Sequence, residues 1–116
     1  MSEELINEIS KIEQSIKGLW SLVNGASTVL SIQEPPFPSG KGIVIIDNNT
    51  DFDNPRRYEY DITVTVKNEI FFNIIETLIN YRFASRLFII DENSIRLVVP
   101  YPAVPNVLVM DLRRIE

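Results

Sequence analysis

The side chains between residues 47 and 53 have the clearest capacity for chemistry in the sequence. The segment reads Asp-Asn-Asn-Thr-Asp-Phe-Asp, which places oxygen atoms at alternate positions. This alternation lets successive side chains reach one divalent cation, as in calcium-binding loops. Phe52 stands where such loops need a glycine, and Tyr58 stands where they need a bidentate glutamate. We therefore expect a polar loop, with a weak metal site as the alternative. The candidate ligands are Asp47, Asn49, Asp51 and Asp53.

Two pairs of adjacent arginines offer a second kind of binding chemistry. They are Arg56 with Arg57 and Arg113 with Arg114. If both pairs lie on one edge of the folded chain, they form a modest patch for an anion or a nucleic acid. The whole chain is acidic, with 16 Asp and Glu residues, 11 Lys and Arg residues and a formal net charge of −5. Because phosphate contacts supply most of the affinity of nucleic-acid binders, this charge places nucleic-acid binding second to protein binding.

The sequence contains no cysteine and no histidine. This composition excludes disulfides, thiolate nucleophiles and cysteine-bound zinc, and it removes the commonest general base. The remaining carboxylates are scattered without a clear catalytic cluster. We therefore predict that the protein is not an enzyme and needs no cofactor. A divalent-metal-dependent enzyme is the third function considered, after protein binding and nucleic-acid binding.

The first 24 residues predict a long amphipathic helix that buries an apolar stripe. Apolar residues recur there at spacings of three and four, namely Leu5, Ile9, Ile12, Ile16, Leu19 and Val23. Asn24 and Gly25 predict its end. Two interpretations stay open, because the helix could pack on its own sheet or contribute to an oligomer. Ile6, Trp20 and Leu22 widen the apolar stripe and are the predicted contacts with a second subunit.

Six later segments have the composition of strands, and one has the spacing of a second helix. The predicted strands are residues 26–33, 43–46, 57–67, 86–90, 95–99 and 107–112. Apolar and polar residues alternate along 57–67, which is typical of a half-buried antiparallel strand. Residues 69–84 carry apolar side chains at helical spacing, with Asn68 as the predicted cap.

The resulting order is α-β-β-β-α-β-β-β. It predicts an α+β fold with a five- or six-stranded, mainly antiparallel sheet and two helices. The chain is the size of one domain, so we expect a single domain over residues 1–116. In it, residues 1–25 form the N-terminal helix and residues 26–116 form the sheet with the second helix.

Asp47 ends the predicted second strand of this order, and Lys67 ends the third, with Thr65 two positions before the lysine. This order of elements resembles the core of the PD-(D/E)xK nucleases and Holliday-junction resolvases. That family has an aspartate on the second strand and Glu-x-Lys on the third, which together hold a divalent metal. The resemblance implies a degenerate nuclease-like core, because threonine replaces the glutamate. Residues 43–112 also resemble the roadblock and longin families of small dimeric adaptors.

These observations favour a small non-enzymatic protein-interaction or regulatory module that forms a homodimer and binds a protein partner. The acidic start of the chain differs from a signal peptide, and no apolar run is long enough to span a bilayer. We therefore predict a cytoplasmic protein without a membrane partner.

Overall fold

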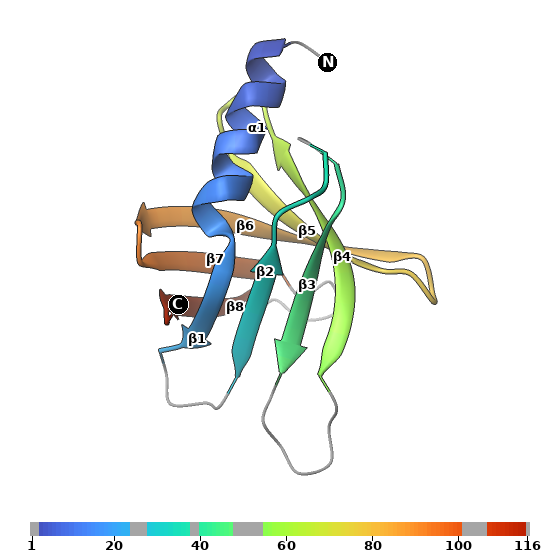
Figure 1. Cartoon of the computed structure of the whole chain (residues 1–116), viewed down its shortest axis with the longest axis vertical. Helices are drawn as coiled ribbons and strands as arrows, with labels where there is room; N and C mark the ends of the chain where they lie inside the picture. The colour runs from blue at the N-terminus through green and yellow to red at the C-terminus, as the bar shows by residue number, and fades with distance from the viewer. Residues whose placement is uncertain (1–2, 24–27, 38–39, 48–54, 101–106, 116) are drawn as a thin grey trace.

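Eight antiparallel strands form a closed barrel, and one helix precedes them in the described part of the chain (Figure 1). The computed structural model describes residues 3–23, 28–37, 40–47, 55–100 and 107–115. Each strand pairs with the next along the chain, and β8 pairs with β1 to close the barrel. The elements are α1 (Glu3–Ile16), β1 (Gly18–Leu22), β2 (Val29–Gln33), β3 (Gly42–Asp47), β4 (Arg56–Val64), β5 (Ile70–Glu76), β6 (Tyr81–Asp91), β7 (Ser94–Pro100) and β8 (Val107–Arg114).

The predicted α+β fold with two helices and a five- or six-stranded sheet is wrong. The strands expected at 26–33, 43–46, 57–67, 86–90, 95–99 and 107–112 are confirmed as β2, β3, β4, β6, β7 and β8, with boundaries shifted by up to five residues. Two further strands come from segments that were predicted as helix. With these additions every strand has a neighbour on both sides, so the sheet closes on itself and has no edge strand.

The N-terminal helix ends at Ile16, well before the predicted end at residue 25. Gly18 has a φ of 132°, a backbone conformation that residues with a side chain rarely adopt. The chain leaves the helix there and continues as β1. Trp20 and Leu22, two positions apart, both face the core, which is the alternation of a strand. The helical spacing of Leu19 and Val23 is therefore a coincidence.

The predicted second helix, residues 69–84, is instead β5, a turn and the start of β6. The run Ile-Phe-Phe-Asn-Ile-Ile is nearly continuously apolar, so it satisfies the helical period and the strand period equally well. Its β-branched and aromatic residues favour the strand. Asn68 and Asn80 have φ values of 63° and 51°, so they make turns, and Asn68 caps no helix. The nuclease-like order of elements required this helix and is therefore absent.

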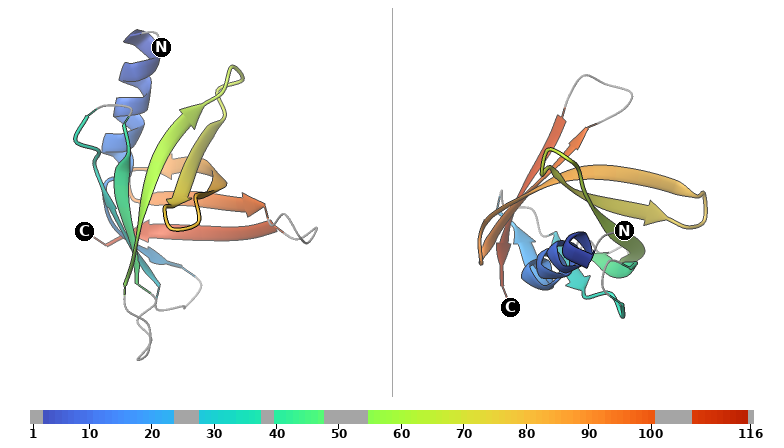
Figure 2. Two further views of the ribbon diagram at one scale, coloured as in Figure 1. Left: turned by 90° about the vertical axis from the view of Figure 1, so that its right-hand side faces the viewer. Right: turned by 90° about the horizontal axis from the view of Figure 1, so that it is seen from above.

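The inward positions of the strands and one face of α1 fill the barrel with side chains. The largest fully buried side chains include Trp20, Tyr60 and Phe72, and the Tyr60 and Phe72 rings stack with centroids 4.6 Å apart. Viewed from above, α1 lies over one end of the barrel (Figure 2). Ile9, Ile12 and Ile16 join the core cluster from this helix, which confirms that its apolar stripe packs on the sheet. At about 25 cal/mol per Å² of buried apolar surface, this core is the main source of stability.

The Tyr60 side chain depends on a glycine in the neighbouring strand. Gly42 is the register partner of Tyr60, and a Cβ at Gly42 would lie 2.5 Å from the Tyr60 ring. The absence of a side chain therefore lets the ring lie against the backbone of β3. In this position the Tyr60 hydroxyl donates a hydrogen bond to the carbonyl oxygen of Gln33 at 2.7 Å.

Burial of Tyr60 makes the stability of the fold sensitive to alkaline pH. Desolvation raises the pKa of the Tyr60 phenol above its ordinary value of 10.0, and the negative charges of Glu13 and Glu34 raise it further. The folded state therefore holds this proton more tightly than the unfolded state. The resulting stability is complete below about pH 10 and is lost as the pH rises above that value.

We expect the free energy of unfolding of the wild type, measured in urea, to fall more steeply with pH above about pH 10 than that of Tyr60→Phe, which has no phenol to ionise. At about pH 7 we expect the wild type to be the more stable of the two, because the variant lacks the hydrogen bond to Gln33. Parallel pH profiles for the two proteins would contradict this prediction. Tyr81, which is exposed, supplies the matched control as Tyr81→Phe.

Candidate functional site

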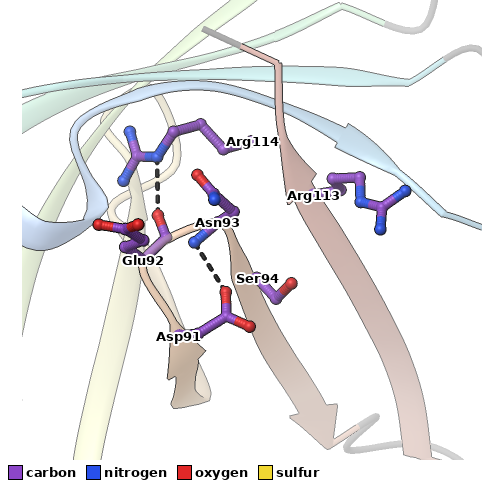
Figure 3. Close-up of a pocket in the computed structure, with 6 residues that line it drawn as sticks. All are labelled: Asp91, Glu92, Asn93, Ser94, Arg113 and Arg114. Atoms are coloured by element: carbon purple, nitrogen blue, oxygen red, sulfur yellow. Dashed lines mark hydrogen bonds between the residues drawn. The ribbon is translucent and has the colours of Figure 1, made fainter.

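The clearest cluster of polar contacts joins the last strand to the end of the helix. Arg114 donates from Nη1 to the carbonyl oxygen of Lys17 and from Nη2 to that of Ser15, both at 2.6 Å. Its Nε donates to the carbonyl oxygen of Glu92 at 2.9 Å (Figure 3). The guanidinium also lies over the Trp20 ring, 4.3 Å from the centroid. The cluster is a structural clamp, which we call the Arg114 clamp.

The Arg114 clamp compensates the unpaired carbonyl groups at the C-terminal end of α1. The last carbonyl groups of a helix have no partner within the helix and carry partial negative charge. The last turn of α1 contains no basic residue of its own. Arg114 supplies that positive charge from β8, and it therefore belongs to the packing of the fold.

A polar hollow lies beside this clamp, at the turn between β6 and β7. Figure 3 shows its lining residues, which are Asp91, Glu92, Asn93, Ser94, Arg113 and Arg114. The Asn93 backbone N–H donates to Asp91 Oδ1 at 2.8 Å, so this carboxylate stabilises its own turn. Arg113 points away from Arg114, on the other face of β8 (Figure 3). Within the described ranges no group of three or more acidic residues could hold a metal ion.

Further close polar contacts lie on the outside of the barrel and connect adjacent strands or strands two apart. Asp61 on β4 accepts hydrogen bonds from Arg82 on β6 and from Asn73 on β5, each at 2.9 Å. Arg96 on β7 pairs with Asp111 on β8 at 2.6 Å. These contacts help to hold the strands in register.

The two predicted arginine pairs do not meet on one edge. Arg56 and Arg57 lie on β4, whereas Arg113 and Arg114 lie on β8, and three strands separate β4 from β8 in either direction around the barrel. Arg114 is also occupied by the clamp. The geometry therefore gives the nucleic-acid patch no support.

The predicted metal loop falls largely outside the described residues. Asn49, Asp51 and Asp53 belong to the segment 48–54, which the structure does not describe. Asp47 is the last residue of β3, where it is half-buried and pairs in register with Val29.

The three residues predicted to contact a second subunit have different positions. Trp20 is fully buried inside the barrel, where its Nε1–H donates to the carbonyl oxygen of Ile16 at 2.8 Å. Leu22 is half-buried and packs against the core, and Ile6 is half-buried on α1. The Trp20 ring is therefore not on the surface of the folded chain.

A surface that sequence reasoning missed lies on the outward positions of β1, β2 and β3 and on Ile115, which directly follows β8. We call it the apolar outer face, and it consists of Ile115, Leu19, Ser21, Val29, Ser31, Ile43 and Ile45. Ile115 is 53 % exposed, and the other six side chains are half-buried. On β4, by contrast, the outward residues include Arg57, Glu59 and Asp61, as expected for a face in water.

The sequence did contain a signal for this face. Residues 43–46 form a continuous apolar run, and strands with such runs are usually covered on both sides. In this barrel the inward residues Val44 and Ile46 belong to the core or pack against it. The outward Ile43 and Ile45 therefore form a second apolar surface on the same strand.

Comparison with protein-family models, with curated proteins and with solved structures finds no match for this chain. None of the helical segments in the described part of the chain has the length and apolar character needed to cross a bilayer.

Proposed function

We propose that the chain is a small, non-enzymatic protein-interaction module that acts as a homodimer in the cytoplasm. The observation that carries this proposal is the apolar outer face. Its residues stand outside a barrel whose core is already filled by the inward side chains. A protein surface with adjacent apolar side chains and few charges is typical of a site that another protein covers.

The roles of the polar side chains support the non-enzymatic part of the proposal. Arg114, Asp61 and Arg96 each have close structural partners, at 2.6 to 2.9 Å. These contacts use up charged groups that a catalytic site would direct at a substrate. Apolar packing against a second protein is the interaction that the remaining surface offers.

A second exposed apolar region supports a role in binding. The hairpin of β5 and β6 extends away from the body of the barrel (Figure 1), and its turn carries Leu78 and Ile79, which are 92 % and 70 % exposed. Tyr81 and Phe83 follow on β6 and contact each other edge to face, with ring centroids 4.5 Å apart. This hairpin leaves a surface for a further protein when two copies associate elsewhere.

The mass of the protein in solution tests the proposal. At 10 to 100 µM, on the order of the concentrations at which small modules associate, we expect sedimentation velocity to give twice the chain mass of 13.3 kDa. Dilution should shift the distribution toward the single-chain mass. A single-chain mass over the whole concentration range would refute the homodimer.

A further inference from the structure

The strand β6 is long, and its two halves have different neighbours. The first half, from Tyr81 to Arg86, pairs with β5, and the second half, from Arg86 onward, pairs with β7. After Val98, β7 leaves β6 and continues beside β8 alone. Among the strands that the structure describes, none therefore pairs with the second side of β6 over residues 81–85. We call this stretch the open side of β6.

The open side of β6 is accessible to another molecule. It lies on the β5–β6 hairpin, which extends away from the body of the barrel (Figure 1), and residues 81–84 are all exposed. Backbone N–H and C=O groups of alternate residues point sideways from a strand and favour a partner strand. Proteins usually protect such a stretch with a proline, a lysine or a bulge. Residues 81–85 contain no proline and no lysine, and they pair with β5 in unbroken register.

The core-facing side chains next to the open side are aromatic. Tyr81 and Phe83 lie two positions apart on this face, and each is 40 % exposed. The register partner of Phe83 on β5 is Ile74, which packs against the core. A strand added beside β6 would have alternate side chains on the same face, opposite these rings. Apolar side chains at those positions would cover the exposed parts of both rings.

The outer face next to the open side is basic. Arg82 contacts Asp61 at 2.9 Å, Arg86 contacts Glu69 at 3.6 Å, and the two arginine side chains are 52 % and 44 % exposed. Ala84 lies between the arginines in the strand, and its small side chain leaves space there. A residue opposite Ala84 on an added strand is a diagonal neighbour of both arginines, within reach of their long side chains. A carboxylate at that position would meet two guanidinium groups.

We propose that the open side of β6 binds an extended segment of a partner protein as an additional antiparallel strand. The segment has apolar residues opposite Tyr81 and Phe83 and an acidic residue opposite Ala84. Antiparallel pairing is the more stable kind, and both neighbours of β6 already have it. The proposal rests on the proposed protein-interaction role, names the partner of a surface separate from the apolar outer face, and does not require the homodimer.

Fluorescence anisotropy with a labelled synthetic peptide tests the proposal. The probe has about nine residues, roughly a strand with its flanks, and reads Glu-Val-Thr-Val at its centre between serine and glycine residues. This order places the glutamate opposite Ala84 and the two valines opposite Phe83 and Tyr81. We expect a dissociation constant below about 100 µM. The same peptide with lysine in place of glutamate should bind at least about fivefold more weakly.

Two further peptides distinguish strand pairing from general apolar contact. Each keeps all the side chains of the probe and carries N-methyl groups on one of the two alternate sets of backbone amides. Only one set can donate hydrogen bonds to β6, because successive amides of a strand point in opposite directions. We therefore expect one N-methylated peptide to bind at least about tenfold more weakly and the other to bind about as well as the probe.

A pair of protein variants places the binding on β6. Ala84→Glu introduces a carboxylate between Arg82 and Arg86 that repels the glutamate of the probe, so it should raise the dissociation constant at least about tenfold. Val23→Glu adds the same charge just after β1, at a side chain that is 58 % exposed, and should leave the constant unchanged. Circular dichroism checks that both variants are folded.

The outcomes separate this proposal from the proposed homodimer. Weaker binding of one N-methylated peptide and of Ala84→Glu, with Val23→Glu unchanged, supports the added strand. Equal binding of the probe and both N-methylated peptides, full affinity of Ala84→Glu, or no binding of the probe up to about 1 mM overturns it, whatever the mass of the chain in solution. A chain that stays monomeric and binds the probe refutes the homodimer alone.

Discussion

Replacing Arg114 with alanine is expected to lower the free energy of unfolding by about 3 kcal/mol, one of the two largest effects anticipated for a single substitution in this protein. The change removes three hydrogen bonds to carbonyl oxygens and the contact of the guanidinium with the Trp20 ring. It also leaves the last carbonyls of α1 beside Trp20 without the cation that compensates their partial charge. Urea unfolding at a fixed protein concentration measures the loss.

Two comparisons make this prediction specific to the geometry of the guanidinium. Arg114→Lys keeps the positive charge but cannot reach Ser15, Lys17 and Glu92 together, so it should recover less than half of the loss. Arg96→Ala breaks an exposed ion pair with Asp111 and should leave the urea midpoint near that of the wild type. If Arg114→Ala and Arg96→Ala had equal effects, the Arg114 clamp would carry no special role.

The second large effect is expected from Gly42→Ala, which should destabilise the fold by about 2 to 3 kcal/mol. The new Cβ would stand 2.5 Å from Cε1 of Tyr60 and 2.6 Å from Cζ, so the ring must move. Movement of the ring disturbs its stack on Phe72 and its hydrogen bond to the carbonyl oxygen of Gln33. Gly42 lies within β3, so this contact is the reason for glycine at the position.

A double-mutant cycle tests that reason. Tyr60→Leu removes the ring at a cost of about 2 kcal/mol, and it also removes the atoms that an alanine at position 42 would meet. The double variant should therefore be more stable than the sum of the single effects predicts, by at least about 1 kcal/mol. Additive effects would mean that the contact between the two residues does not explain the cost of Gly42→Ala.

The sequence predicted strands well where alternation was strong and failed where apolar residues were continuous. Tyr58, Tyr60 and Ile62 alternate with polar residues at a period of two, which fits a strand and not a helix, so β4 was recognisable. The run from Ile70 to Ile75 fits two periods, so only its β-branched and aromatic residues and the turn at Asn80 distinguish a strand from a helix. Closure of the barrel depends on pairing between the first and last strands, which local patterns do not encode.

The candidate site was harder to predict for the same reason. Arg114 looked like half of a basic patch, because its partners Lys17 and Ser15 are 97 and 99 residues away in the sequence. Trp20 was predicted to lie on the helix and to contact a second subunit, and its burial follows from the strand that begins at Gly18. The apolar outer face became visible only from the register of β1, β2 and β3.

The closure of the barrel by β1 and β8 has a consequence for how the chain folds. Until residues 107–114 are available, β1 and β7 each keep one edge without a partner, and the Arg114 clamp cannot form. Pairing across nearly the full length of the chain carries a large loop-closure entropy and is typical of slow folding. During synthesis on the ribosome, β8 emerges after β1 to β7 and completes the barrel, and until then the open edges of β1 and β7 can pair with other chains.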